Sequence, residues 1–177
     1  MAHVFEAAPT GRAKCRGCRE PIGKGEIRFG ERLPNPFAEG EMTLWFHPMC
    51  AAYKRPDVLL EGLAGAATEV AGREPLERAA RLALARHRLQ RIDGAEISPT
   101  GQARCRNCKE LIERGGWRIR LVFHEEGNFS PGGYIHLDCR EAYFESPDIL
   151  DPLLHFSPAL TGQEREALRD ALGREDP

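Results

Sequence analysis

Alternation of apolar and polar residues marks three short segments as candidate β-strands. Residues 117–123 place Trp, Ile, Leu and Phe at every second position with more polar residues between them, which is typical of a strand with one buried face. Residues 27–31 and 43–46 are also short and rich in apolar residues. The pattern therefore predicts short strands in both halves of the chain.

A helical period runs through residues 74–92, where Pro75 suits a helix start and Gly94 a helix end. Apolar residues fall on two roughly opposite faces: Leu82, Ala85, Leu89 and Ile92 on one, and Leu76, Ala79, Ala80 and Ala83 on the other. A helix that is apolar on two sides needs two partners. These would be the two halves of the chain, or one half and a second copy in a homodimer.

A second helix is predicted near the C-terminus, over residues 166–172. It follows Thr161-Gly-Gln-Glu164, which fits a capping box. Strands and helices together indicate small mixed α+β units.

The six cysteines divide into two sets with matching spacing. Cys15 and Cys18 recur 90 residues later, and a His-x2-Cys pair that begins at His47 recurs 89 residues later. Such a repeat predicts two copies of one structural unit. We therefore expect units at residues 1–70 and 95–177, joined by a helical linker at residues 71–94.

Each set offers three thiolates and one imidazole, which is a complete tetrahedral zinc site with no position left for water or substrate. A lone Cys-x2-Cys pair could be a redox pair or chance, but two copies with the same downstream pair favour metal. The sequence predicts two Zn²⁺ ions per chain and argues against zinc catalysis. The predicted ligands are Cys15, Cys18, His47 and Cys50 in the first unit, and Cys105, Cys108, His136 and Cys139 in the second.

With 25 basic and 27 acidic residues the formal net charge is −2, so any nucleic-acid site must be local. Local positive charge gathers around the two Cys-x2-Cys turns, at Arg12, Lys14, Arg16 and Arg19, and at Arg104, Arg106 and Lys109. No leader-like or membrane-spanning apolar segment is recognisable. We expect a cytoplasmic, nucleoid-associated protein, or a nuclear one if the source has a nucleus, with no membrane partner.

The first unit resembles the zinc finger of poly(ADP-ribose) polymerases, which also occurs in some DNA ligases that act at strand breaks. The resemblance rests on Cys15-x2-Cys18, 28 intervening residues and His47-x2-Cys50, with Gly-Arg-Ala before the first cysteine and Trp45 before the histidine. The second unit resembles the same finger, but has Gln102 and Tyr134 at two of these positions. The fold implied is two tandem zinc-stabilised α+β fingers joined by a helical linker.

The resemblance implies a finger that contacts phosphates and lays apolar loop residues against a base pair exposed at a DNA break, alone or with repair enzymes. The loops would be residues 33–43 and 124–133. The remaining residues leave no room for a transferase or ligase domain, so we expect a binding protein and not an enzyme. The candidate DNA contacts are Arg12, Lys14, Arg16, Arg28, Phe37 and Met42 in the first finger, and Arg104, Arg118 and Phe129 in the second.

Two alternatives stay open. Phe37 and Phe129 could fold back onto the core, and acidic residues flank both loops, at Glu39, Glu41, Glu125 and Glu126. The chain could then be a protein-protein interaction adaptor whose zinc serves folding alone. Residues 1–60 carry nine basic and seven acidic residues, and residues 96–152 carry seven and ten, so the first finger is the stronger candidate for DNA.

Overall fold

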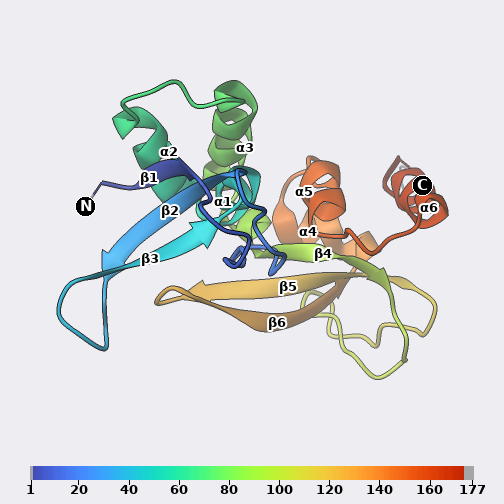
Figure 1. The fold of residues 1–177 in the computed structure, drawn as a ribbon. Helices are drawn as coiled ribbons and strands as arrows, with labels where there is room; N and C mark the ends of the chain where they lie inside the picture. The colour runs from blue at the N-terminus through green and yellow to red at the C-terminus, as the bar shows by residue number, and fades with distance from the viewer. Residues whose placement is uncertain (1, 174–177) are drawn as a thin grey trace. The chain divides into compact units, whose positions relative to one another are not determined.

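The computed structural model describes residues 2–173 and divides the chain into two compact units, residues 1–90 and 91–177. Each unit contains one three-stranded antiparallel sheet with helices that follow it (Figure 1). The predicted α+β class with two zinc-binding modules is confirmed. No helix in the described residues is long and apolar enough to cross a membrane.

In the first unit the strand order is β1-β2-β3, and the helices come after the sheet. Helices α1 and α2 begin at prolines, whose missing N–H is no loss at a helix start. Both helices pack on β2 and on α3. The elements are β1 Val4–Ala7, β2 Ile27–Pro34, β3 Glu41–Phe46, α1 Pro48–Lys54, α2 Pro56–Gly65 and α3 Arg73–Ala85.

The second unit repeats the sheet as β4-β5-β6, with α5 packed against β4. The predicted capping box is confirmed: the Thr161 amide donates to Glu164 Oε2 at 2.8 Å, and the Glu164 amide donates to Thr161 Oγ1 at 3.2 Å. The elements are β4 Ile92–Ile97, β5 Trp117–Glu125, β6 Asn128–His136, the 3-10 turn η2 Leu137–Cys139, α4 Arg140–Phe144, α5 Leu150–His155 and α6 Gly162–Gly173.

The two cores match position by position. Each unit buries three apolar side chains that follow the same repeat as the zinc ligands, and all six are 0% or 1% exposed. They are Ile22, Phe29 and Phe46 in the first unit, and Ile112, Ile119 and Ile135 in the second. The duplication therefore includes the packed interior as well as the metal ligands.

The helix predicted over residues 74–92 was wrong at its C-terminal end. Helix α3 ends at Ala85 because Arg86 leaves helical geometry, and residues His87–Arg91 form the 3-10 turn η1. Gly94 lies inside β4 with a φ of 110°, and a Cβ there would be 2.2 Å from the Phe156 carbonyl oxygen. Its role is close backbone approach within the second unit, not termination of a helix.

The apolar face predicted at Leu82, Ala85, Leu89 and Ile92 is not a single face of one helix. Leu89 is buried in η1 and Ile92 in β4, whereas the buried face of α3, at Leu76, Ala80 and Ala83, belongs to the helix that packs on α1 and α2. The helix is thus part of the first unit. The helix with two apolar faces, from which a homodimer was predicted, is therefore not present in residues 74–92.

The loop predicted at residues 124–133 was also wrong, because most of it is the β5-β6 hairpin. Residues His124 and Phe129 are paired across this hairpin, and Glu126 and Gly127 make the turn with positive φ angles. In the first unit β2 and β3 extend into the predicted loop, so only residues 35–40 remain outside the strands. The two fingers therefore present different tips.

Candidate metal centres and nucleic-acid interface

The first two cysteines of each unit lie on a tight turn that is the same in both copies. The Arg19 amide donates to the Cys15 carbonyl at 2.8 Å, and the Lys109 amide donates to the Cys105 carbonyl at 2.9 Å. Arg19 and Lys109 have φ angles of 68° and 69°, a region that few non-glycine residues adopt. This shared strained position closes the turn and brings both thiols of each pair to one side.

The second pair of ligands comes from the end of the sheet and the helix or 3-10 turn that follows it. His47 Nδ1 lies 3.4 Å from Cys18 Sγ and 3.9 Å from Cys50 Sγ. In the second unit His136 Nδ1 lies 3.3 Å from Cys108 Sγ and 3.8 Å from Cys139 Sγ.

Both ligand sets fit a zinc ion. All four ligand atoms of each centre lie within 4.8 Å of one another. Zn–S bonds of about 2.3 Å and Zn–N bonds of about 2.0 Å in a tetrahedron require edges of roughly 3.5 to 3.8 Å. The N–S separations above, 3.3 to 3.9 Å, scatter closely around these edges, so both sets of side chains fit a zinc ion and the two predicted zinc centres are confirmed.

Backbone amides and neighbouring thiols favour the thiolate form that binds zinc. Hydrogen bonds from Cys18 and Cys50, with the His47 amide at 3.3 Å, lower the pKa of Cys15 to about 3. Burial raises the pKa of Cys105, but the backbone amides of Cys108 and His136 outweigh it and bring this pKa to about 6.

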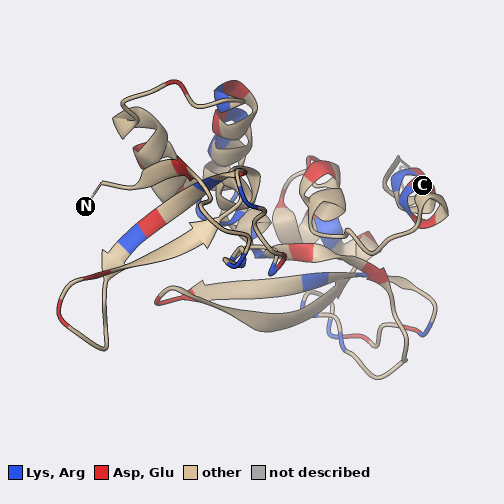
Figure 2. Ribbon diagram, viewed as in Figure 1, with Lys and Arg blue, Asp and Glu red and all other residues tan. Residues whose placement is uncertain are grey.

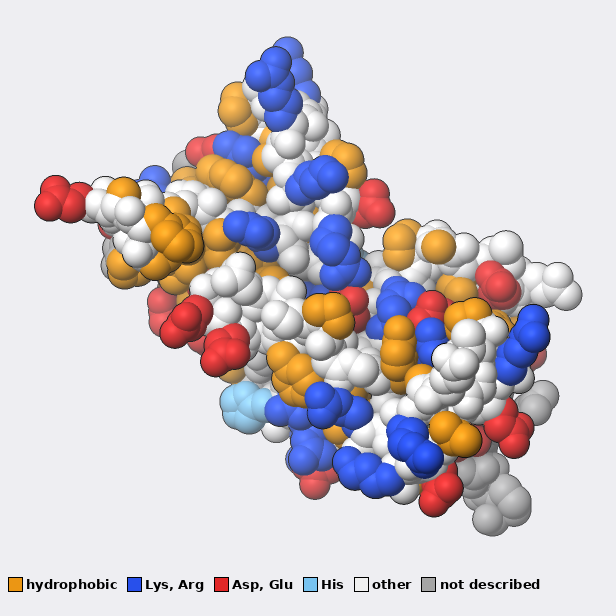
Figure 3. Space-filling view, turned by 90° about the horizontal axis from the view of Figure 1, so that it is seen from below, with side chains coloured by type: hydrophobic (Ala, Val, Ile, Leu, Met, Phe, Trp, Pro, Cys, Tyr) orange, Lys and Arg blue, Asp and Glu red, His pale blue; other side chains and the backbone are white. Residues whose placement is uncertain are grey.

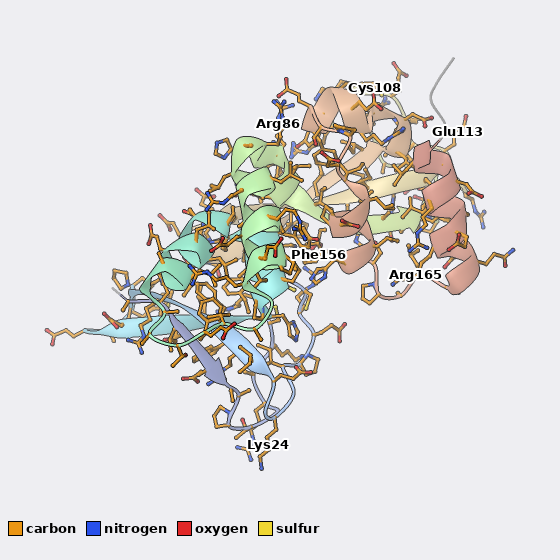
Figure 4. All side chains as sticks on the ribbon, turned by 90° about the horizontal axis from the view of Figure 1, so that it is seen from above. Lys24, Arg86, Cys108, Glu113, Phe156 and Arg165 are labelled. Carbon is orange, nitrogen blue, oxygen red and sulfur yellow. The ribbon has the colours of Figure 1, made fainter. Side chains whose placement is uncertain are left out.

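The histidine rings are oriented from the side away from the thiols. His136 Nε2 lies 3.0 Å from the Leu111 carbonyl oxygen, which fixes the tautomer with Nδ1 free for metal. His47 Nε2 lies 3.8 Å from Glu26 Oε2. The centres differ in access: Cys108 is exposed and lies at the outer edge of the second unit in Figure 4, whereas Cys18 is half-buried.

Three basic side chains around the first Cys-x2-Cys turn are accessible to an anion. Arg12, Lys14 and Arg16 are exposed, and none of their side chains forms an ion pair within residues 2–173. Lys24 marks the end of the projecting segment between β1 and β2 in Figure 4. In the second finger Arg104 donates to the Lys109 carbonyl at 3.2 Å, and Lys109 donates to the Arg106 carbonyl at 2.6 Å. Those cations are tied to their own turn.

Phe37 is at the tip of the first finger's loop and is 93% exposed. The loop is nevertheless ordered by local bonds: the Phe37 amide donates to Asn35 Oδ1 at 2.9 Å, and the Asn35 amide donates to the Gly40 carbonyl at 2.9 Å. The alternative that Phe37 folds back onto the core is thereby excluded. Met42 is half-buried on β3, where it pairs with Leu33.

Phe129 has a different environment from Phe37. It is half-buried on β6, and its ring centroid lies 4.8 Å from that of His124. The structure therefore gives the second finger no counterpart of the exposed Phe37 ring.

Arg28 and Arg118 are buried rather than presented. Arg28 is 8% exposed, its Nε donates to Glu6 Oε1 at 3.1 Å, and its guanidinium carbon lies 3.5 Å from the centroid of Trp45. Arg118 is 6% exposed, pairs with Glu96 and lies 3.7 Å from the centroid of Tyr134. Both guanidinium groups are thus already paired, and their contacts with DNA stay predictions.

Glu6 and Glu96 are the partners of these arginines and were not predicted from the sequence. Each glutamate lies 22 residues before its arginine, so the repeat that identified the zinc ligands also contained this signal. The pair of Glu31 and Arg55 was not predicted either. Arg55 Nη2 and Nε donate to the Glu31 carboxylate oxygens at 2.6 and 3.0 Å. This pair has no counterpart in the second finger, because the position that corresponds to Glu31 is Leu121.

Two zinc centres of three cysteines and one histidine, each at the end of a three-stranded sheet, define a tandem zinc-finger protein. Residues 6–86, which contain the first finger, match the family described as the poly(ADP-ribose) polymerase and DNA-ligase Zn-finger region. The resemblance inferred from the ligand spacing is confirmed for this finger.

Curated relatives extend the similarity beyond one finger. Poly [ADP-ribose] polymerase 1 of Oryza sativa subsp. japonica is 26% identical over 140 residues, which is 76% of this chain and 14% of the relative. Poly [ADP-ribose] polymerase of Drosophila melanogaster is 25% identical over 164 residues, 78% of this chain and 16% of the relative. Each alignment is longer than either unit, so it includes residues of both fingers. The chain spans about one sixth of the length of these relatives.

Proposed function

We propose that this protein binds DNA at strand breaks through phosphate contacts and aromatic stacking. One observation carries the proposal: an aromatic ring that is 93% exposed, at the tip of a loop ordered by its own hydrogen bonds. An ordered loop holds Phe37 out in water, where an apolar side chain has no stabilising contact, and that is typical of a side chain kept for a partner. A base pair that has lost its stacking neighbour at a break offers a flat apolar face of matching shape.

The exposed cations of the same finger support DNA as that partner. Arg12, Lys14 and Arg16 form no ion pairs within the described residues, so a phosphate would not have to displace a carboxylate to reach them. Basic and acidic residues are interspersed on both units in Figure 2, and the Lys and Arg side chains that gather on part of the face in Figure 3 have acidic side chains beside them. Few phosphate contacts imply a weak grip on intact duplex, which leaves the discrimination to stacking.

Binding rather than catalysis is the function that both centres support. Each zinc site has four protein ligands, and a site of that composition is structural because no coordination position is left for a reacting group. The family model matches residues 6–86, and the alignment with the Oryza sativa relative covers 14% of that protein. In this proposal the protein marks breaks, and repair enzymes are its partners in the cytoplasm and nucleoid, or in a nucleus.

A second candidate function is that of a protein-protein adaptor, and one observation favours it. Glu39 and Glu41 are exposed next to Phe37, and carboxylates repel phosphate. In that case Phe37 would insert into an apolar pocket of a partner protein.

The two functions differ in DNA affinity. We expect the zinc-loaded protein to bind a nicked or gapped duplex at least about ten-fold more tightly than an intact duplex of the same sequence, since one stacked base contributes roughly 1 to 3 kcal/mol. Fluorescence anisotropy with labelled duplexes at two salt concentrations measures this. Equal affinity for nicked and intact DNA would exclude break recognition and favour the adaptor.

A further inference from the structure

Two arginine side chains contact one aromatic ring in the second finger. The guanidinium carbon of Arg91 lies 4.7 Å from the ring centroid of Phe123, and that of Arg106 lies 5.4 Å from it. Arg91 precedes β4, Arg106 lies between the two cysteines of the metal turn, and Phe123 is on β5. The fold thus brings two positive charges from separate segments to one place.

Both arginines are held in position by other contacts. Arg91 Nη1 lies 3.0 Å from the hydroxyl oxygen of Tyr143. The Arg106 amide donates to the Tyr134 carbonyl at 2.9 Å, and the Arg106 side chain lies across Gly133, where a Cβ would come within 3.2 Å of its Nε. The Arg91 side chain, restrained by Tyr143, loses little entropy when it binds a ligand, and the backbone of Arg106 is fixed.

Among residues 2–173, no carboxylate pairs with either guanidinium. Within the part of the chain that the structure describes, Arg91 and Arg106 form no ion pair, whereas Arg118 and Arg120 of the same sheet both pair with Glu96. This is notable because residues 96–152 contain more acidic than basic residues. Both guanidinium carbons lie within 5.4 Å of the Phe123 centroid, and two positive charges that lack a counter-ion among the described residues attract an anion.

We propose that Arg91, Arg106 and Phe123 form a phosphate-binding site that takes a phosphodiester group of a DNA strand. The planar guanidinium presents paired N–H donors that match the oxygens of a phosphate. Because DNA is the ligand of the proposed function, the identity of this anion rests on that function. The site adds affinity for the strand and no preference for a break, since phosphates occur along any duplex.

The site is specific to the second finger. Arg106 corresponds to Arg16 in the repeat, but the position of Phe123 corresponds to Leu33, and nothing in the first unit corresponds to Arg91 except the first residue of the chain. The zinc-finger resemblance pointed to Arg118 and Phe129 instead, and both of these side chains have partners within the finger.

Substitution in the full zinc-loaded chain tests the site. We expect Arg106→Gln and Arg91→Gln each to weaken binding to intact and nicked duplex by about five-fold or more, and to make the slope of log affinity against log salt shallower by about one. The matched control is Arg114→Gln, which removes an exposed arginine of the same unit that forms no ion pair with any described residue. It should change affinity by less than about two-fold. Zinc content and melting temperature, measured on each variant, separate binding from folding.

The outcomes distinguish this site from the proposed function. If the wild type shows no preference for nicks while Arg106→Gln still weakens duplex binding, break recognition fails and the phosphate site stands. The site is overturned if both variants, folded and zinc-loaded, bind DNA as Arg114→Gln does. It is also overturned if the two substitutions abolish binding of inorganic phosphate or of a poly-glutamate peptide but leave DNA affinity unchanged.

Discussion

Glu6 and Arg28 face each other directly across β1 and β2, and Glu96 and Arg118 repeat this pair across β4 and β5. In both fingers the guanidinium also lies on an aromatic ring of the third strand, at 3.5 Å from the centroid of Trp45 and 3.7 Å from that of Tyr134. Each arginine therefore joins all three strands of its sheet. A contact between Arg28 and DNA would require the guanidinium to give up part of this arrangement.

Arg28→Ala and Arg118→Ala should each destabilise their own finger. The arginines are nearly buried and their glutamates only partly so, and a hydrogen bond to a charged group contributes about 1.5 to 3 kcal/mol, so we expect losses of roughly 1 to 3 kcal/mol. Denaturant unfolding at fixed zinc measures them, with Arg114→Ala as the control. Unchanged stability in both variants would show that these ion pairs do not stabilise the sheets.

When both variants are compared in their folded state, we expect Arg28→Ala to lose more affinity for nicked DNA than Arg118→Ala. The reason is that the second finger has more acidic than basic residues, which makes it the weaker candidate for DNA.

Arg55→Ala should be more damaging than either. Glu31 is 0% exposed and its carboxylate is bound by both Nε and Nη2 of Arg55. Loss of the guanidinium would leave a buried charge, at a cost of about 3 to 5 kcal/mol.

The second finger suggests the rescue for that variant. Its position corresponding to Glu31 is Leu121, and the motif Arg55-Pro-Asp recurs as Ser146-Pro-Asp. Glu31→Leu combined with Arg55→Ser should therefore recover stability to within about 1 to 2 kcal/mol of the wild type, because an apolar side chain replaces the buried charge. A double variant as unstable as Arg55→Ala would mean that the ion pair alone does not account for the difference between the two fingers at these positions.

Zinc content should be two per chain, and Cys18→Ala and Cys108→Ala should each reduce it to one. Zinc binding supplies roughly 10 to 16 kcal/mol in small fingers, so each variant should unfold its own unit.

Chelation should remove zinc from the second centre first, because Cys108 is exposed and Cys18 is half-buried. Elemental analysis and circular dichroism during chelator titration measure both effects. Loss from the first centre before the second would contradict the role given to ligand exposure.

The basic residues of the two metal turns should contribute unequally to DNA binding. Lys14 and Arg104 occupy corresponding positions, but Lys14 has no ion pair within residues 2–173, and Arg104 is bonded to the Lys109 carbonyl. We expect Lys14→Gln to weaken nick binding by about three-fold or more and to lower the salt slope by about one, and Arg104→Gln to have the smaller effect. A larger effect of Arg104→Gln would show that the second turn is the main phosphate contact.

The features that the sequence could predict are those that repeat. The zinc ligands, the strands at Ile27 and Trp117 and the capping box at Thr161 depend on spacing or on residues close together in the chain. Local chemistry determines such features, so they can be read without knowledge of the fold.

The features that escaped prediction depend on contacts between distant segments. Glycine is a residue that often ends a helix, yet Gly94 is a strand residue that lies against the Phe156 carbonyl, 62 residues away. The Ala- and Leu-rich period of α3 continued through Leu89 and Ile92, but tertiary packing placed those two side chains in η1 and β4. Periodicity could not reveal this, because it records which residues are apolar and not which surface they bury.

Phe37→Ala is the substitution that tests break recognition. Phe37 makes no contribution to the core, so its removal should leave stability and zinc content unchanged. Ile27→Ala is the matched control, because Ile27 is another exposed apolar residue of the same finger, away from the loop.

The decisive measurement is the ratio of affinities for nicked and intact duplex, compared between the wild type and Phe37→Ala. We predict that the variant loses most of this ratio, by about five-fold or more, while its affinity for intact duplex and its salt slope stay nearly constant. Ile27→Ala should keep the wild-type ratio. If Phe37→Ala retains the full preference for nicked DNA, or weakens both duplexes equally, the exposed ring does not read the break.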